Sequence, residues 1–242
     1  MRIEVVLSPT LYDGRNIQLH HTTVAVDVLR ATSAICAAFC AGADEIVPLD
    51  SLEPLPEYRE RGYTLAAERN GEKISGALCG NSPTEYLSMD LRGQRLAYST
   101  TNGTVSILRA ASSERLYIGT FANISALSKM LALDKREDLV VLCSGWKGDP
   151  SIEDTLFAGA LIEKMFQQGC DIHLINDAAI MAESLWREAK NDLYNYCLKA
   201  THVKRLQRLN YENDIRWALT LDTCQIVPQY INGKLVICAS AD

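Results

Sequence analysis

Five consecutive small or polar residues, TTNGT at positions 100–104, lie between the apolar run RLAYS and a helical run. The hydroxyls of Thr100, Thr101 and Thr104, the Asn102 amide and the close backbone approach that Gly103 permits would together bind an anion at the start of a helix. Residues of these types also serve simply as a helix N-cap. The length of the run modestly favours the anion site.

A second polar cluster follows the apolar run VAV, where Asp27 precedes Arg30 and Thr32. The carboxylate could ligate a cation, the guanidinium could pair with an anion, and the hydroxyl would lie beside a helix N-terminus. In the alternative interpretation, Asp27 and Thr32 only cap the helix and Arg30 is solvated. The sequence fits both interpretations equally well.

The segment CGNSPTEY, residues 79–86, is predicted to turn into a helix with Pro83 at the first helical position. Asn81 or Ser82 would cap this helix. These two side chains also remain available as hydrogen-bond donors for a ligand.

The run LVVLCSGWKGDPSIED, residues 139–154, is predicted to be a strand, a glycine-bearing loop and a helix start. Glu153 and Asp154 are carboxylates of the kind that a hard cation requires. Residues 151–154 also fit the S-x-x-[DE] capping box, which is the simpler role for Asp154. Cys143 precedes this helix, and a cysteine at that position could be a nucleophile. In phosphatases with a C-x5-R motif an arginine follows the cysteine by six residues, but this chain has Asp149 there. We therefore predict that Cys143 is a core residue.

The composition limits the partners. A net charge of -6 and a pI of about 5.3 give no footprint for nucleic acid or an anionic membrane, and no apolar run approaches the length of a membrane span. We therefore expect a small-molecule ligand and a cytoplasmic location.

The eight cysteines contain no CxxC pair and are predicted to be mainly core residues. Among the four histidines, His21, His173 and His202 are unpatterned, so a histidine-rich metal centre is not expected.

Short β-branched runs alternate with helical runs, as in RIEVVLS, TTVAVDV, RLYIG and DLVVLCS. This alternation predicts a three-layer α/β/α fold around a largely parallel or mixed sheet, in one domain over residues 1–242. Long amphipathic helical segments are predicted over residues 152–169 and 177–200, and Asn232 with Gly233 predicts a closing hairpin. Loops at the carboxyl ends of the strands line the ligand site in such sheets, which is where the polar clusters would meet.

Five segments occur in an order that resembles one family: AVDVLRAT, GNSPTEY, TTNGT, GTFAN and CSGWKGDPSIEDTLFAG. They resemble the magnesium-dependent 2-phosphosulfolactate phosphatases of coenzyme M biosynthesis, over residues 27–228. The resemblance implies an α/β/α fold, a Mg²⁺ ion, and release of phosphate from a small phosphorylated hydroxy acid with sulfolactate as the other product. Residues 146–150 depart from the family's usual sequence, so a different acyl tail would be recognised at this loop.

The resemblance also implies a set of site residues. For catalysis it implies Asp27, Arg30, Thr101, Asn102 and Asp154. For substrate binding it implies Thr32, Asn81, Ser82, Thr100, Gly103, Thr104 and Asn123. For Mg²⁺ it implies Asp27, Glu68, Glu153 and Asp154. We expect the cradle at residues 100–104 and Arg30 to hold the phosphoryl oxygens, while Asn81, Ser82 and Asn123 hold the sulfonate and carboxylate.

Alternatives to this hypothesis concern both mechanism and class. Either a metal-bound water attacks the phosphorus directly, or Asp27, less favourably Cys143, is a covalent nucleophile. Another class is a non-catalytic protein that binds small anions in the same pocket, and a third is a phosphotransferase or lyase acting on a phosphorylated three-carbon acid. We also expect a homodimer formed by the helical second part of the chain.

Overall fold

Eleven strands form one sheet in the computed structural model, which describes residues 1–12, 21–134 and 137–237. The strands are β1 (Arg2–Val6), β2 (Thr22–Val26), β3 (Glu45–Leu49), β4 (Thr64–Arg69), β5 (Glu72–Lys73), β6 (Arg95–Ser99), β7 (Arg115–Gly119), β8 (Asp138–Cys143), β9 (His173–Leu174), β10 (Pro228–Ile231) and β11 (Lys234–Ile237). Their order in the sheet is β5-β4-β6-β3-β11-β10-β7-β2-β8-β1-β9. The predicted strands are confirmed.

Two parallel groups of strands are joined by the C-terminal hairpin. Strands β4, β6 and β3 pair in parallel, and so do β7, β2, β8, β1 and β9. Between these groups lie β10 and β11, which pair with β7 and β3 in antiparallel fashion through one residue pair each. The hairpin turn has positive φ angles at Asn232 (50°) and Gly233 (87°), as the Asn-Gly signal predicted. The sheet is therefore mixed.

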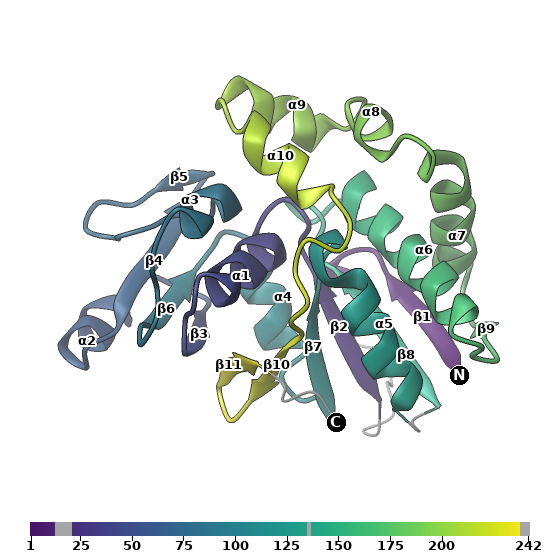
Figure 1. Cartoon of the computed structure of the whole chain (residues 1–242), viewed down its shortest axis with the longest axis horizontal. Helices are drawn as coiled ribbons and strands as arrows, with labels where there is room; N and C mark the ends of the chain where they lie inside the picture. Colours follow the sequence, from purple (N-terminus) through teal and green to yellow (C-terminus); the bar gives the residue numbers. More distant parts are fainter. Residues whose placement is uncertain (13–20, 135–136, 238–242) are drawn as a thin grey trace.

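Helices cover both faces of the sheet (Figure 1). They are α1 (Ala31–Cys40), α2 (Leu55–Glu60), α3 (Pro83–Leu87), α4 (Gly103–Arg109), α5 (Ile124–Leu133), α6 (Ile152–Gln167), α7 (Asp177–Ala189), α8 (Leu193–Cys197), α9 (Thr201–Arg208) and α10 (Glu212–Ala218), with 3₁₀ turns at Pro9–Leu11 and Phe121–Asn123. Val24 and Val26 of β2 pack in one core with α5, α6 and α7, whereas the intervening Ala25 packs in a second core with α1 and α4. This alternation confirms the three-layer α/β/α architecture.

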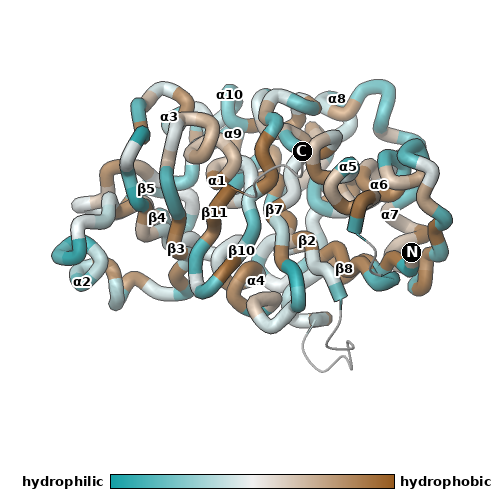
Figure 2. The backbone as a smooth tube through the Cα atoms, turned by 60° about the horizontal axis from the view of Figure 1, so that its bottom comes forward, coloured by the Kyte–Doolittle hydropathy of each residue, from teal (hydrophilic) through white to brown (hydrophobic). Residues whose placement is uncertain are grey.

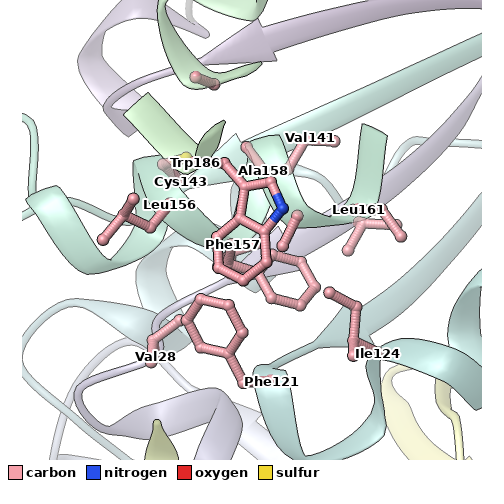
Figure 3. Packing of buried hydrophobic residues seen from close by; sticks show 14 of the residues in the cluster. Val28, Phe121, Ile124, Val141, Cys143, Leu156, Phe157, Ala158, Leu161 and Trp186 are labelled. Carbon is pink, nitrogen blue, oxygen red and sulfur yellow. The ribbon is translucent and has the colours of Figure 1, made fainter. Parts of the chain in front are cut away.

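Phe121, Phe157 and Trp186 lie together in the first core (Figure 3). Phe121 meets Phe157 edge to face at 5.6 Å and stacks on Trp186 at 5.9 Å. Figure 2 shows hydrophobic backbone segments in interior strands such as β3 and hydrophilic segments at the periphery near α2. The seven described cysteines are free thiols, and five of them are buried, as expected of core residues. Cys238 lies outside the described residues.

One helix prediction is wrong in its length. The segment 177–200 forms two helices, α7 and α8, because Asp192 begins a new helix and its carboxylate accepts a hydrogen bond from Asn195 N. Aspartate competes for local backbone donors, which favours caps over helix interiors. No helix in the described ranges is long and apolar enough to cross a membrane.

Candidate functional site

A pocket lies where residues at the carboxyl ends of β2, β4 and β6 meet the β8–α6 loop and α9. One wall, here called the strand-end wall, consists of Asp27, Glu68, Thr101 and Asn102. A second group of lining residues, here called the stacked wall, consists of Trp146, Lys147, His202 and Arg205. The remaining lining residues are Leu29, Arg30, Asn70, Gly71, Asn81 and Leu206.

Asp27 is the central carboxyl of the strand-end wall. Its side chain is buried, and burial together with nearby Glu153 and Glu68 raises its pKa to about 6, while His202 opposes the rise. Gly103 of α4 lies directly against it. A Cβ at residue 103 would lie 2.6 Å from Asp27 Oδ2 and 2.3 Å from Ala31 Cβ, so only glycine permits this approach.

The structure divides the predicted cradle at residues 100–104 into two parts. Thr100 and Thr104 are buried and hydrogen-bonded to each other, with Thr104 N donating to Thr100 Oγ1 at 3.1 Å. They shape the turn and do not line the pocket. Thr101 and Asn102 do line it. The Asn102 amide has no hydrogen-bond partner in the described part of the chain, and Thr101 Oγ1 accepts from Asn70 N.

Glu68 fastens two loops with its two carboxylate oxygens. Oε1 accepts from Thr101 N at 2.7 Å, and Oε2 accepts from Gly71 N at 2.6 Å. The carboxylate lines the pocket, but both of its oxygens already hold backbone donors. Glu68 therefore positions Thr101 and the β4–β5 turn.

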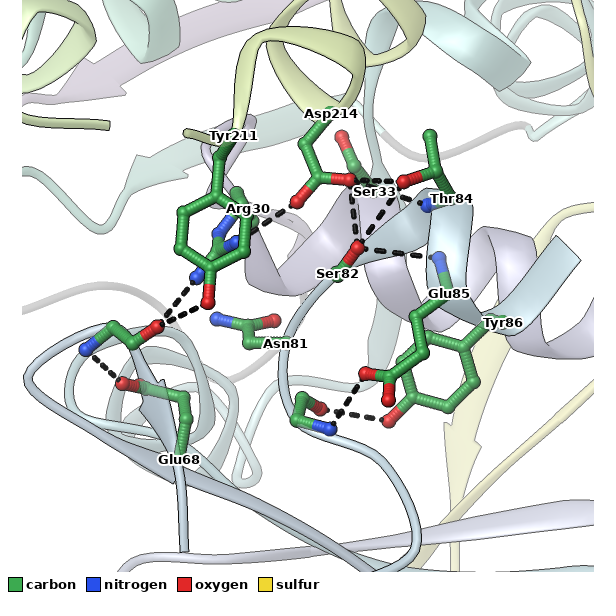
Figure 4. A network of polar contacts seen from close by, with 12 residues as sticks. Arg30, Ser33, Glu68, Asn81, Ser82, Thr84, Glu85, Tyr86, Tyr211 and Asp214 are labelled. Atoms are coloured by element: carbon green, nitrogen blue, oxygen red, sulfur yellow. Dashed lines mark hydrogen bonds and ion pairs between the residues drawn. The ribbon is translucent and has the colours of Figure 1, made fainter. Parts of the chain in front are cut away.

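Arg30 is held in a buried polar network that the sequence interpretation only partly foresaw (Figure 4). Its Nη1 donates to Asp214 Oδ2 at 2.8 Å and its Nη2 to Gly71 O at 3.1 Å, while the guanidinium lies 3.7 Å from the centre of the Tyr211 ring. Arg30 is thus not solvated. Arg30 lines the pocket, but both of its terminal nitrogens already donate to protein acceptors, so its main role there is to order the pocket.

Ser82 belongs to the same network and does not line the pocket. Its hydroxyl caps α3 by accepting a hydrogen bond from Glu85 N. The same hydroxyl donates to Asp214 Oδ1 at 2.7 Å, and the Thr84 hydroxyl also donates to this oxygen.

Asn81 does line the pocket, and its Oδ1 accepts a hydrogen bond from the Tyr98 hydroxyl. No local sequence pattern points to Asp214, because it lies 184 residues from its partner Arg30.

Glu153 and Asp154 begin α6 but have different surroundings. Asp154 Oδ1 accepts from Val28 N at 2.8 Å and Oδ2 from Gly145 N at 3.0 Å, so its carboxylate ties the loop after β2 to the loop after β8. The predicted capping box is half formed: Ser151 Oγ accepts from Asp154 N, but the carboxylate points elsewhere. Glu153 Oε1 lies 3.0 Å from His202 Nδ1.

Two buried side-chain polar atoms lack hydrogen-bond partners in the described ranges, Glu153 Oε2 and Ser144 Oγ. Such orphaned acceptors are costly unless an ion or water satisfies them. The described residues include no group of three or more His, Cys, Asp or Glu side chains arranged to hold a metal. The unpartnered Glu153 oxygen and the Asp27 carboxyl at the pocket are oxygen donors of the type that suits an ion such as Mg²⁺, which is commonly held by one or two carboxylates with further oxygens from its ligand.

Two residues assigned to substrate binding are hydrogen-bonded elsewhere. The Thr32 hydroxyl donates to Asp27 O and accepts from Asp27 N, which fixes the turn before α1. Asn123 Oδ1 accepts from Thr120 N, and its Nδ2 donates to Ile118 O and Ile226 O. Neither lines the pocket, so we leave both out of the proposed site.

Burial raises the pKa of the Cys143 thiol well above its usual value, in agreement with the predicted core cysteine.

The stacked wall was missed by the sequence interpretation. The Trp146 ring lies parallel to the His202 imidazole, 5.5 Å away with a 12° angle between planes. Lys147 Nζ lies 5.1 Å and the Arg205 guanidinium carbon 5.8 Å from the centre of the Trp146 ring. A usable signal existed in α9, because residues 202, 205 and 206 share one helical face.

Comparison with known proteins identifies the family of this chain. A family model described as 2-phosphosulpholactate phosphatase matches residues 8–233. A probable 2-phosphosulfolactate phosphatase of Caldanaerobacter subterraneus is 35% identical over 87% of this chain and 88% of its own length. Proteins of the same description from Thermotoga maritima (34%, covering 89% and 92%) and Synechocystis (33%, covering 99% and 100%) are also similar. The chain belongs to the 2-phosphosulfolactate phosphatase family.

Proposed function

We propose that this protein hydrolyses the phosphate ester of 2-phosphosulfolactate, or of a similar phosphorylated hydroxy acid, to the hydroxy acid and inorganic phosphate, with Mg²⁺ as cofactor. The observation that carries the proposal is the buried Asp27 carboxyl, which faces a pocket between free amide and hydroxyl donors on one side and cations on the other. This is a suitable arrangement for a phosphoryl group and its counter-ion in a member of this family.

Asp27 lines the pocket, and Glu153, which does not line it, is close enough to act on the charge of Asp27. These two carboxylates would hold Mg²⁺, since Glu153 Oε2 has no hydrogen-bond partner among the described residues and the oxygens of Glu68 and Asp154 are taken by backbone donors. When bound, the ion neutralises phosphoryl charge and lowers the pKa of a coordinated water. This narrows the four ligands expected from the sequence to two. Calorimetric titration of Mg²⁺ into the wild type and into Glu153→Gln tests the assignment without any substrate, because loss of one ligand should weaken binding severalfold or more.

Thr101 and Asn102 would donate hydrogen bonds to the phosphoryl oxygens. The Thr101 hydroxyl accepts from Asn70 N and therefore keeps its own proton for a donor bond. Arg30 acts indirectly, because it anchors Gly71 and thereby the loop that carries Asn70. Asn81 borders the same space.

His202 is the group that we propose protonates the leaving alkoxide. Its Nδ1 is held by Glu153 and its ring by Trp146, so the ring orientation is fixed and Nε2 is the nitrogen left to transfer a proton. An aryl phosphate with a weakly basic leaving group does not need this proton. His202→Gln should therefore lower the rate with an alkyl ester more than with p-nitrophenyl phosphate.

Inorganic phosphate release from a panel of phosphorylated hydroxy acids, with Mg²⁺ and with EDTA, tests the reaction itself. Metal-dependent release supports the proposal, whereas tight binding without release would favour the alternative of a non-catalytic anion-binding protein. Products that contain no inorganic phosphate would instead favour a transferase or lyase. Single turnover in H₂¹⁸O distinguishes the chemical routes, because label in the enzyme would mark Asp27 as a covalent nucleophile.

A homodimer remains our proposal for the assembly. Phe166 on α6 and Ile180 and Met181 on α7 are 72%, 50% and 58% exposed, so the outer surface of these two helices is our candidate contact with a second copy. Light scattering coupled to size-exclusion chromatography should give twice the chain mass. Met181→Glu should then yield the monomer.

A further inference from the structure

The stacked wall carries two cations that have no acidic partner. Lys147 and Arg205 both line the pocket, and neither forms an ion pair with a carboxylate among the described residues. Arg30, by comparison, is neutralised by Asp214. Two positive charges near the same Trp146 ring, with no counter-ion among the described residues, indicate a local anion site in a protein of net charge -6.

The backbone that presents Lys147 is an unusual one. Lys147 has φ of 55°, between Gly145 at 59° and Gly148 at 89°. The loop is closed by two hydrogen bonds between the backbones of Trp146 and Asp149, at 2.8 and 3.1 Å. A non-glycine residue in the left-handed region costs roughly 1 kcal/mol or more and persists where its surroundings require it. Here it places Lys147 at the rim of the pocket.

Arg205 approaches the same Trp146 ring from a different element, α9. It follows His202 by three residues, so both project from one face of α9, and His202 is held against the Trp146 ring. Arg205 donates to the carbonyl of Asn70, which orients the guanidinium across the pocket mouth. Trp146 thus lies close to both cations and provides an apolar surface between them.

We propose that Lys147 and Arg205 form a second anion subsite, which binds an anionic group on the organic part of the substrate, a sulfonate or a carboxylate. The inference rests on the proposed function, because it assumes that the phosphoryl group occupies the strand-end wall. It replaces the earlier assignment of this role to Asn81, Ser82 and Asn123, two of which do not line the pocket. The substrate class is then a phosphate monoester that carries a further anion near the ester carbon.

Four phosphate esters of related secondary alcohols separate the possibilities: 2-phosphosulfolactate, 2-phospholactate without the sulfonate, 1-sulfo-2-propyl phosphate without the carboxylate, and isopropyl phosphate without either. We expect Lys147→Met to lower kcat/KM about tenfold or more for the esters whose second anion it binds. Isopropyl phosphate should stay within twofold of the wild-type value. The ester on which the loss falls identifies the anion.

Lys147→Met is the cleaner variant, since Arg205→Met also removes the contact with Asn70. Arg208→Met is the matched control, because Arg208 is exposed on α9 and does not line the pocket. Equal losses on all four esters, or no loss on any, would overturn the proposal. If the wild type hydrolyses none of them, the proposed function fails. Calorimetry of sulfolactate binding then tests the anion subsite separately. If Lys147→Met binds sulfolactate more weakly than the wild type and Arg208→Met does not, the subsite is supported. If Lys147→Met binds sulfolactate as tightly as the wild type, the subsite is rejected.

Discussion

The two walls of the pocket are built by different means. On the strand-end wall, carboxylates and hydroxyls are fixed by short backbone hydrogen bonds, such as those from Thr101 N and Gly71 N to Glu68. On the stacked wall, the Trp146 and His202 rings lie against each other, and Lys147 and Arg205 have no counter-ion among the described residues. The first wall therefore has the rigidity that bond cleavage requires. The second wall has the exposed charge that selects a ligand.

Behind the strand-end wall, the buried ion pair of Arg30 and Asp214 gives the largest expected effect on stability. Asp214→Ala leaves the Arg30 guanidinium buried and unpaired, so the free energy of unfolding should fall by about 3–5 kcal/mol in urea titrations. Glu183→Ala breaks the exposed pair with Arg187 and is the matched control, with an expected loss of at most about 1 kcal/mol. Similar losses in both variants would contradict the structural role of the buried pair.

Asp27 should make the metal-free protein less stable as the pH rises. Its pKa is raised from 3.8 to about 6, so the folded state retains a proton that the unfolded state loses between these values. This group then removes up to about 3 kcal/mol of stability as the pH rises through that window. Asp27→Asn should lack this decline and be more stable than the wild type at pH 7 in EDTA.

Urea titrations at pH 4.5 and pH 7 measure this difference. Asp149→Asn, at an exposed position, is the control and should follow the wild type. If Asp27→Asn is equally or less stable at pH 7, the account of a buried, destabilising carboxylate is wrong.

Gly103→Ala tests how tightly the strand-end wall is packed. The new methyl group would overlap Ala31 and Asp27, so we expect roughly 1–3 kcal/mol lower stability and a large loss of activity. Gly80→Ala is a milder comparison, since the nearest atom to its Cβ would be 3.2 Å away. Unaltered kcat/KM in Gly103→Ala would show that the contact with Asp27 is not needed.

The smallest effect is expected on the stacked wall. Trp146→Leu removes the ring that lies against His202, so stability should fall by about 1 kcal/mol. Trp146→Phe, which keeps a ring, should lose less. A larger loss of stability here than in Asp214→Ala would reverse the contrast between the walls.

Asp27, Thr101 and Asn102 of the strand-end wall could be singled out from the sequence because each follows an apolar strand in a local polar motif, whereas Glu68 came only from the resemblance to a family. The sequence also predicted the parallel strands and the Asn-Gly hairpin. Local motifs do not reveal which member faces the pocket, so Thr100, Thr104, Thr32 and Asn123 were assigned to ligand binding although they hold the backbone. The stacked wall depends on contacts between the β8–α6 loop and α9, some 55 residues apart, and no local pattern specifies such contacts.

Phosphate release from 2-phosphosulfolactate in excess Mg²⁺, compared between the wild type, Asp27→Asn and the Asp149→Asn control, tests the central claim most directly. The account predicts metal-dependent release by the wild type and the control, and a loss of at least about a thousandfold in Asp27→Asn, because both the ion and the phosphoryl group depend on this carboxylate. Near-normal release by Asp27→Asn would contradict the placement of the reaction in this pocket.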